Sequence, residues 1–273
     1  MKLALNGATT MRADLETDIL AASRAGFDYL EIWAAKLRRF LESSSVNQLK
    51  ELLDRHELKP YSINSIEHIT FRDAMAHEKL LIECEDLCSI AQAIDCPYIV
   101  VVPSPLPEGK TSRDTIEESA RVLEELSRVA AAFNVSLAFE FLGQPGCSVQ
   151  TLELAYEIVR ETGRENVGLV IDSFHFYAGG SSLESIEALD PEKLFIFHIN
   201  DAEEKPREEL QDSHRLLPGL GILPLKEILG ALRHIGYERV ASVEIFRPEY
   251  WERDPFELAR EAHLAVSSVI RNS

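Results

Sequence analysis

The 273-residue sequence predicts a single-domain α/β protein with the (β/α)8 barrel architecture, on the basis of three observations. Short apolar segments alternate with segments of helical periodicity along the whole chain, which is typical of parallel sheets with helical crossovers. Eight such pairs fit the length of one barrel. No linker or change in composition divides the chain, so we expect one domain over residues 1–273. A doubly wound open sheet is the alternative, but the sequence lacks a glycine-rich fingerprint after the first strand.

The predicted strands are short apolar runs without regular polar alternation, as in strands that are covered on both faces. They comprise residues 2–6, 29–33, 60–64, 98–102, 135–140, 168–172, 194–198 and 240–246.

The predicted helices have apolar residues three or four positions apart, as at Leu15 and Ile19. Gly26 is expected to end the first helix, and Ser45 to cap the start of the second. The helices cover residues 15–25, 46–56, 74–94, 114–133, 151–160, 183–189, 224–235 and 255–270. Residues 202–221 are polar and have no periodicity, so we expect a long loop, which in a compact domain is usually functional or mobile.

The composition excludes several classes of partner. A net charge of −18 repels nucleic acid and anionic lipid over most of the surface, so we expect neither as a partner. No apolar run approaches the roughly 20 residues that cross a membrane. The four cysteines show no zinc-binding spacing, and a reducing cytoplasm is their simplest setting. The expected partner is therefore a small molecule, and a homo-oligomer is compatible with the sequence.

Four predicted strands end in, or close to, a side chain that can bind metal or transfer protons. Asp172 follows the buried run at residues 168–171, and burying its charge would be costly without a partner. The structural alternative for this residue is a carboxylate that caps the following loop. Glu140, His198 and Glu244 stand at the same end of three further apolar runs. Because catalytic groups of such barrels lie at the carboxyl ends of the strands, and successive strands are neighbours, we expect the four side chains to converge.

Three carboxylates and one imidazole form an oxygen-rich site for one divalent cation. We expect Glu140, Asp172, His198 and Glu244 to bind Mn²⁺, with Zn²⁺, Co²⁺ and Mg²⁺ as alternatives. Four protein ligands leave room for two substrate oxygens. The structural alternative is a set of buried acids paired with arginine or lysine. It is weaker because basic residues are scarce and none ends one of the first six strands.

Such a site predicts proton transfer next to a carbonyl. A metal that chelates the carbonyl and hydroxyl of an α-hydroxyketone acidifies the adjacent C–H and stabilises the enediolate. Two carboxylates that flank that carbon can remove and return the proton. We expect Glu140 and Glu244 to be this pair, because their strands would lie on opposite sides of the metal.

Other polar and aromatic residues near the strand ends are candidates for contact with substrate. His175 could bond a substrate oxygen, or it could pack in the loop after its strand. Arg215 could orient a hydroxyl or the forming oxyanion, although most loop arginines are simply solvated. Asn64 stands at the end of the third strand. Trp33 and Phe174 could form an apolar wall for a ring, or belong to the core.

The chain resembles the xylose-isomerase-like TIM-barrel superfamily of sugar isomerases and epimerases along essentially its whole length. Within it, the motifs are most similar to those of the inosose isomerases, which act on 2-keto-myo-inositol. The runs that carry the resemblance are residues 6–10, 138–143, 170–176, 197–201 and 242–250. The runs Asp172-Ser-Phe-His-Phe176 and Phe246-Arg-Pro-Glu-Tyr250 are fairly specific to that branch.

The resemblance implies a polyol ketone substrate and interconversion of 2-keto-myo-inositol and 1-keto-D-chiro-inositol in inositol catabolism. It implies that Glu140, Asp172, His198 and Glu244 are the metal ligands, that Glu140 and Glu244 also transfer protons, and that His175 contacts substrate. Two features depart from the pattern. Gly7 stands where the close relatives are expected to have an acidic residue, and residues 202–215 look divergent.

Three other functions are compatible with parts of the same sequence pattern. Lyases of the superfamily dehydrate keto-inositols or 3-dehydroshikimate through the same enolisation. Apurinic-site endonucleases of the superfamily hold three zinc ions, and Asp212, His214 and His68 faintly resemble their additional ligands. The acidic charge of the chain and the absence of a histidine after the fourth strand oppose this function. The third possible function is that of a sugar-binding barrel without catalytic activity. The intact set of four metal-binding side chains argues against it.

Overall fold

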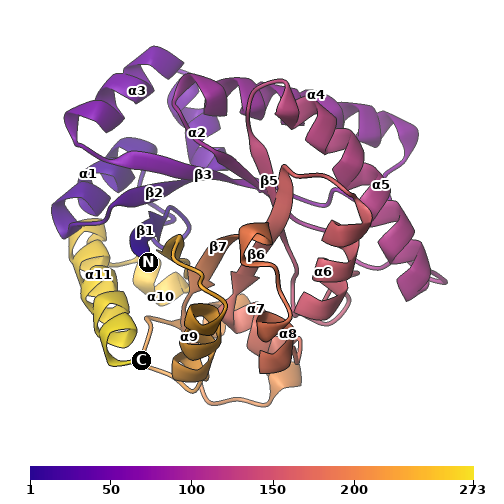
Figure 1. Ribbon diagram of the computed structural model, residues 1–273. Helices are drawn as coiled ribbons and strands as arrows, with labels where there is room; N and C mark the ends of the chain where they lie inside the picture. Colours follow the sequence, from indigo (N-terminus) through magenta and orange to yellow (C-terminus); the bar gives the residue numbers. More distant parts are fainter.

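The computed structural model describes residues 1–273 and has the predicted architecture, a closed barrel of eight parallel strands surrounded by helices (Figure 1). Around the barrel, each strand pairs with its neighbours in the order β1-β10-β7-β6-β5-β4-β3-β2. The barrel strands are β1 (Lys2–Asn6), β2 (Tyr29–Trp33), β3 (Lys59–Ile66), β4 (Tyr98–Val101), β5 (Ser136–Glu140), β6 (Val167–Asp172), β7 (Leu194–Ile199) and β10 (Val240–Val243). The last strand was predicted to reach residue 246, but it ends at Val243, so Glu244 lies just beyond its end.

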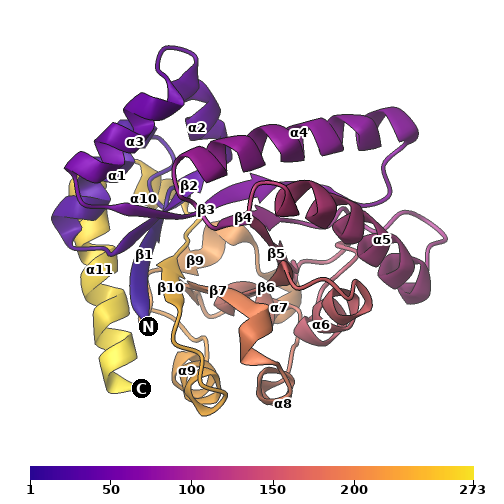
Figure 2. The same ribbon diagram turned by 45° about the horizontal axis from the view of Figure 1, so that its top comes forward.

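All eight predicted helices are present and pack around the outside of the barrel (Figure 2). They are α1 (Leu15–Ala25), α3 (Val46–Arg55), α4 (Ala74–Ala93), α5 (Ser112–Ala131), α6 (Leu152–Glu161), α8 (Leu183–Glu187), α9 (Leu225–His234) and α11 (Pro255–Asn272). Capping residues mark helix ends as expected. The Ser45 hydroxyl accepts from the backbone N–H of Gln48 at the start of α3, and Gly26 ends α1 with a φ of 91°. No helix combines the length and the apolar composition needed to span a membrane.

Three further helices were not predicted, and each follows a strand with little or no loop. They are α2 (Ala34–Leu41), α7 (Ser173–Ala178) and α10 (Pro248–Trp251). The N-cap residues of α2 and α10 make no side-chain cap bond, so the usual signal is missing. The cap of α7 is Asp172, whose carboxylate accepts from the backbone N–H of His175 at 2.9 Å. Asp172 was expected either to cap the following segment or to belong to the site, and in the structure its carboxylate caps a helix.

The expectation of an irregular loop over residues 202–221 was wrong in part. This segment includes two 3-10 turns, η2 (Arg207–Glu209) and η3 (Asp212–His214), and a small antiparallel pair, β8 (Asp201–Ala202) with β9 (Arg215–Leu216). A third turn, η1 (Pro191–Lys193), precedes β7. The Asp201 carboxylate organises the segment, because it accepts hydrogen bonds from the backbone N–H groups of Ala202, Gly219 and Leu223.

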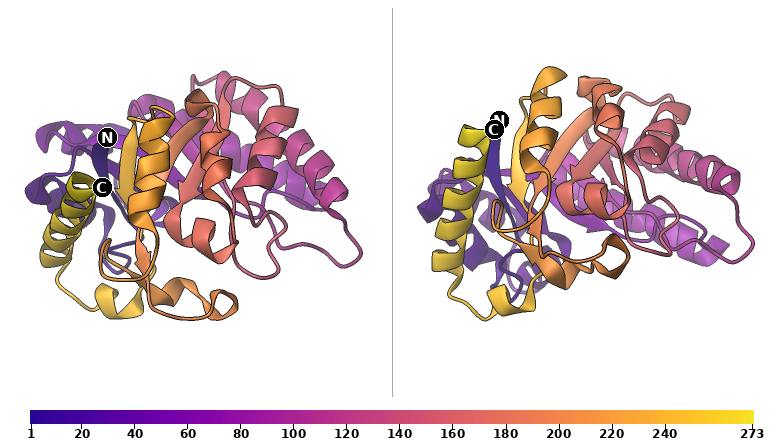
Figure 3. Two further views of the ribbon diagram at one scale, coloured as in Figure 1. Left: turned by 60° about the horizontal axis from the view of Figure 1, so that its bottom comes forward. Right: turned by 90° about the horizontal axis from the view of Figure 1, so that it is seen from below.

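The core has two parts. The larger lies between the barrel and its helices, and the smaller fills the interior of the barrel with side chains such as Tyr61, Val100 and Phe195. The Tyr61 hydroxyl donates to the carbonyl oxygen of Phe195 at 3.1 Å, which satisfies a polar group inside that core. The interior is therefore packed, and a site can form only at an end of the barrel. Both termini lie at the same end, while α10 and the segment around η2 lie at the other (Figure 3).

Candidate active site

Four side chains meet at the carboxyl end of the barrel. Glu140, Asp172, His198 and Glu244 each offer one ligand atom, and these atoms all lie within 4.8 Å of one another. They come from β5, β6, β7 and the residue after β10, which are consecutive around the barrel. All four are buried, with at most 4% of each residue exposed. The sequence thus anticipated which side chains the fold brings together.

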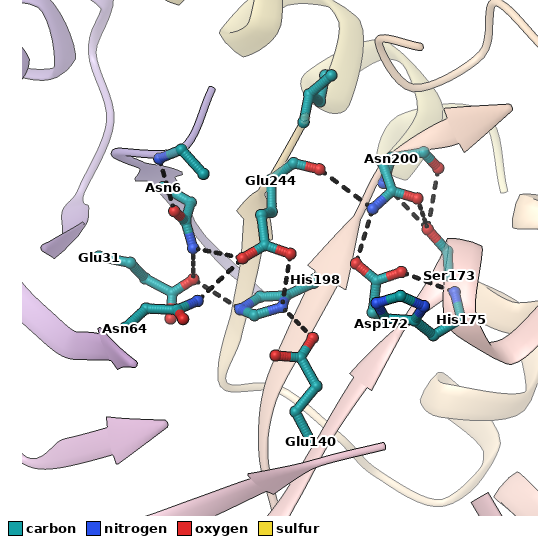
Figure 4. Close-up of polar contacts among 12 residues, drawn as sticks. Asn6, Glu31, Asn64, Glu140, Asp172, Ser173, His175, His198, Asn200 and Glu244 are labelled. Atoms are coloured by element: carbon teal, nitrogen blue, oxygen red, sulfur yellow. Dashed lines mark hydrogen bonds and ion pairs between the residues drawn. The ribbon is translucent and has the colours of Figure 1, made fainter. Parts of the chain in front are cut away.

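His198 lies at the centre of this group (Figure 4). Its Nδ1 is 2.9 Å from Oε1 of Glu140 and 3.3 Å from Oε2 of Glu244. Its Nε2 is 2.8 Å from Oε2 of Glu31, in a direction that does not align the N–H with that oxygen. The imidazole is therefore surrounded by carboxylates on both edges.

Amide side chains hold the carboxylates in place. Oε1 of Glu244 accepts from Nδ2 of Asn6 at 3.0 Å and from Nδ2 of Asn64 at 2.9 Å. Oδ2 of Asp172 accepts from Nδ2 of Asn200 at 2.8 Å. These donors satisfy oxygen atoms that the protein has removed from water, which would otherwise be costly.

Negative charge exceeds positive charge in the buried part of the site. Glu31, Glu140, Asp172 and Glu244 face only two cationic groups, Arg215 and a protonated His198. When all four carboxylates are ionised, two negative charges have no counter-charge on the protein. A divalent cation would supply it, and three carboxylates with one imidazole are ligands suited to Mn²⁺, Zn²⁺ or Co²⁺.

The pKa values express the same imbalance. Burial, reinforced by Glu244 and Asp172, raises the pKa of Glu140 to about 7. Burial alone would lower the pKa of His198, but the carboxylates of Glu244, Glu31 and Glu140 outweigh it and raise that pKa well above its usual value. Burial opposes ionisation of Asp172, yet the nearby Arg215 guanidinium keeps its pKa below the usual value.

Arg215 on β9 is fully buried and every N–H of its guanidinium faces an acceptor. Its Nη1 is 2.7 Å from Oδ2 of Asp172 and 3.2 Å from Oε2 of Glu244. Its Nη2 donates to Nε2 of His175 at 3.0 Å, and both Nη2 and Nε donate to Asp212. The sequence suggested a solvated loop residue as the alternative, and this the structure excludes.

Aromatic rings fix the position of the Arg215 guanidinium. Its central carbon lies 4.8 Å from the ring centre of Phe174 and 5.1 Å from that of Phe246. Phe174 is completely buried and does not line the cavity, so of its two expected roles the structure favours the core, where its ring packs against Arg215. The wall is formed by Trp33 and Phe246, whose ring centres are 5.6 Å apart.

A cavity of about 230 Å³ opens at the carboxyl end of the barrel, next to the four ligand side chains, of which Glu140 and Glu244 line it. It is lined by all four residues that were expected to contact substrate, namely Trp33, Asn64, His175 and Arg215. Polar residues such as Gln144 and Asp212, which are hydrogen-bonded to each other, line it as well. The hollow is polar and small enough to suit a single sugar-sized ring.

His175 is a neutral imidazole in this arrangement. Burial, together with the positive charge of Arg215, lowers its pKa. Because Arg215 can only donate, Nε2 of His175 accepts, and the ring proton is assigned to Nδ1. That Nδ1 is buried and has no hydrogen-bond partner in the protein.

A larger hollow, about 660 Å³, lies at the opposite end of the barrel and is lined by Tyr29, Tyr61, Tyr98 and Arg239, among others. No group of three or more metal-binding side chains gathers there, because the only such group in the chain is at the carboxyl end. Chemistry therefore belongs to the smaller cavity, at the end where barrel enzymes carry their active sites.

The loop after β1 carries Asn6 and is held by a buried ion pair. Nζ of Lys36 lies 2.7 Å from Oδ2 of Asp18, and it also donates to the carbonyl oxygens of Gly7 and Thr10. A Cβ atom on Gly7 would lie 3.0 Å from Oδ2 of Asp18 and 3.1 Å from Cβ of Trp33. An acidic side chain would not fit here, which gives a physical reason for glycine at this position.

Sequence reasoning missed Glu31, Asn200 and Asp212 as members of the site. Asp212 had been considered only as a ligand of a nuclease-type site. Glu31 lies inside a short strand, two residues before its end, where a buried carboxylate between apolar neighbours was a usable signal. Asn200 follows β7 directly, and its amide bonds both Asp172 and the carbonyl oxygen of Glu244.

This geometry agrees with comparisons to known proteins. The family model described as xylose isomerase-like TIM barrel matches residues 19–266. The chain belongs to this family. The inosose isomerase of Bacillus velezensis is 39% identical over 273 residues, covering 99% of this chain and 97% of the relative. That of Bacillus subtilis is 38% identical over 273 residues, covering 99% and 98%.

A crystal structure of the IolI protein with a bound zinc atom superposes on this member of the xylose isomerase-like family with a TM-score of 0.97. The two chains are 38% identical, and the match covers 100% of this chain and 99% of the other. The resemblance inferred from the sequence motifs is thereby confirmed.

The endonuclease reading finds no support in the geometry of this family member. A three-metal site would need a second cluster of ligands built from His68, Asp212 and His214. These residues do not join any further group of metal-binding side chains. Asp212 instead pairs with Arg215, and the side chain of His68 is 60% exposed at the rim.

Proposed function

We propose that this protein is a metal-dependent isomerase that interconverts 2-keto-myo-inositol and 1-keto-D-chiro-inositol. The observation that carries the proposal is the group of four buried ligand side chains next to a small polar cavity, in a site that holds more carboxylates than cationic groups. The names of the full-length relatives support the substrate class. The four cysteines are free thiols, which accords with a reducing compartment such as the cytoplasm.

Glu140, Asp172, His198 and Glu244 would hold the divalent ion, for which we favour Mn²⁺ on the number of oxygen ligands. When bound there, the ion would polarise a ketone and its neighbouring hydroxyl, and so acidify the C–H of the carbon that bears the hydroxyl.

The two glutamates account for the proton movements. One takes the proton from the carbon that bears the hydroxyl, and the electron pair of that C–H bond forms the double bond of an enediol as the ketone oxygen gains a proton. The other delivers a proton to the former ketone carbon, while the first carbon's oxygen loses its proton and becomes the new ketone. Which glutamate begins depends on the face of the substrate.

Four residues of the cavity would position the polyol ring. Trp33 offers an apolar face to the carbon skeleton, and Asn64 stands beside Glu244. Arg215 would stabilise charge that develops on the substrate oxygens. His175 lines the cavity as well, and its imidazole would contact a substrate oxygen.

The test is incubation of the Mn²⁺-treated protein with 2-keto-myo-inositol in D₂O, followed by NMR. We expect a new ketone isomer and replacement of a carbon-bound hydrogen by deuterium. Ketohexoses and 3-dehydroshikimate serve as alternative substrates in the same assay. An alkene signal with loss of water would instead identify a dehydratase, and the absence of any C–H exchange with every substrate would contradict enolisation.

Glu244→Gln and Glu140→Gln provide the matched controls for chemistry. Each keeps the shape of the side chain but removes the group that carries the proton, so turnover should fall by about 100-fold or more. The fold should be retained, as judged by circular dichroism. Full activity in Glu244→Gln would remove this residue from the mechanism.

A further inference from the structure

Glu31 is a carboxylate of the site that the proposed chemistry does not use. It lies in the middle of β2 and is completely buried. Unlike Glu140 and Glu244, it does not line the cavity, and it is not a member of the four-ligand group. A buried carboxylate is costly, so its contacts should explain why the fold retains it.

Three polar groups surround this carboxylate. Oε1 accepts from the hydroxyl of Ser62 on β3. Oε2 accepts from Nδ2 of Asn6 at 3.0 Å. It also lies 2.8 Å from Nε2 of His198, a close electrostatic contact in which the N–H does not point at the oxygen. The other ring nitrogen of His198, Nδ1, is the one that faces Glu140 and Glu244. Glu31 therefore lies behind the imidazole, on the side away from the metal ligands (Figure 4).

Asn6 connects Glu31 to a second member of the site. Its single Nδ2 group donates both to Oε2 of Glu31 and to Oε1 of Glu244, at 3.0 Å in each case. Its Oδ1 accepts from the backbone N–H of Ala8, which fixes the orientation of the amide. The position of Glu31 thus bears on two of the four ligand side chains, one directly and one through this amide.

We propose that Glu31 is a positioning residue for the metal site: its negative charge, 2.8 Å from Nε2 of His198, favours the ring proton on that nitrogen, so that Nδ1 presents its lone pair to the ion. The proposal rests on the proposed function, because it presumes that the four-residue group binds metal. A carboxylate on the far nitrogen of a ligand histidine orients the ring and makes it a stronger ligand. Loss of such a partner typically weakens metal binding 10- to 100-fold.

The experiment measures Zn²⁺ affinity by competition with a chromophoric chelator at one fixed pH. Glu31→Gln keeps the size of the side chain and removes its charge, and we expect its dissociation constant to rise about 10- to 100-fold. Glu31→Asp keeps the charge but withdraws it from Nε2, so its affinity should fall between those of the wild type and Glu31→Gln. An unchanged affinity in Glu31→Gln would overturn the proposal.

Glu125→Gln is the matched control. The Glu125 carboxylate also faces a histidine, with Oε2 2.6 Å from Nε2 of His77, but this pair joins helices α5 and α4 on the outside of the barrel, away from the ligand side chains. Its Zn²⁺ affinity should equal that of the wild type, whereas a general effect of losing a carboxylate beside a histidine would weaken both variants alike and overturn a specific role for Glu31.

A second measurement needs no variant. In the Zn²⁺-loaded wild type, long-range ¹H–¹⁵N NMR of the histidine rings should show His198 protonated at Nε2 and unprotonated at Nδ1. The opposite tautomer would overturn the proposal. A wild-type protein that binds no divalent ion at all would overturn the proposed function instead, so the two failures are distinguishable.

Discussion

Nη1 of Arg215 lies 2.7 Å from Oδ2 of Asp172, and both side chains are completely buried. The same nitrogen is 3.2 Å from Oε2 of Glu244. One guanidinium therefore neutralises part of the charge of two of the proposed metal ligands. The site thus holds a protein cation next to the place proposed for a metal cation. Without it, three closely spaced carboxylates would repel one another in a medium of low polarity.

Replacing Arg215 by methionine should therefore destabilise the metal-free protein. Removal of one partner from a buried ion pair costs about 3–5 kcal/mol, because the other charge is left uncompensated. Addition of Mn²⁺ should raise the unfolding temperature of Arg215→Met by more than that of the wild type, since no neighbouring positive charge opposes the ion. Thermal unfolding with and without Mn²⁺ measures both effects.

Arg253→Met is the control for loss of an arginine. It breaks a partly exposed pair with Glu261 and should change the free energy of unfolding by only about 0.5 kcal/mol. A smaller Mn²⁺ effect in Arg215→Met than in the wild type would contradict this account.

Gly143 sets the distance between the loop after β5 and helix α7. A Cβ atom at this position would lie 2.2 Å from the carbonyl oxygen of His175 and 2.4 Å from the backbone nitrogen of Gly179. Gly143→Ala must therefore push α7 away and move His175, and we expect a loss of about 1–3 kcal/mol in the free energy of unfolding, together with lower activity. Denaturant titration measures the change.

Gly230 is the control for that substitution. It lies within α9, and a Cβ atom there would meet nothing within 4 Å. Gly230→Ala should stabilise the protein by about 0.5–1 kcal/mol, because alanine favours the helix. If both alanine variants shifted stability in the same direction, the close approach at Gly143 would not be the cause.

The buried pair of Lys36 and Asp18 should behave as one unit. Lys36→Met leaves the Asp18 carboxylate without its cation and the carbonyl oxygens of Gly7 and Thr10 without their donor, so a loss of about 3–5 kcal/mol is expected. In a double-mutant cycle, Lys36→Met with Asp18→Asn should cost less than the sum of the single changes by at least about 1 kcal/mol. The exposed pair of Lys50 and Asp95 should show a coupling of about 0–1 kcal/mol. Simple additivity at Lys36 and Asp18 would show that the two residues act independently.

The cap of α1 should make stability depend on pH. Hydrogen bonds from Thr17 lower the pKa of the Asp14 carboxyl. A carboxyl whose pKa is lowered by folding contributes stability at pH values above its unfolded pKa of 3.8, and this contribution is lost as the pH falls through the lower folded value. Asp14→Ala should cost about 1 kcal/mol at pH 7, and the difference from wild type should narrow below about pH 4. Ser45→Ala, at an uncharged cap, should show a difference that does not vary with pH.

The sequence predicted the strands well because each is a short apolar run bounded by polar or turn residues, and burial on both faces leaves such a run few alternatives. It failed at α2, α7 and α10. These helices follow a strand closely, and their starts depend on backbone geometry or on Asp172, which was expected to cap a loop and not a helix. The segment after residue 201 was misjudged because its order comes from one carboxylate that bonds backbone groups up to 22 residues away.

What the sequence by itself determined is the barrel and the identity of the four strand-end side chains, since alternation of apolar runs and helical periodicity specifies parallel strands whose carboxyl ends share one side. Only the tertiary structure decided which other groups accompany them. Arg215 reaches Asp172 across 43 residues, and Asn6 reaches Glu244 across 238. Glu31 on β2 meets His198 on β7, although β1 and β10 lie between these two strands in the closed barrel. The physical reason is that closure of the barrel turns separation along the chain into contact, and no local pattern in the sequence encodes which distant polar groups will then satisfy one another.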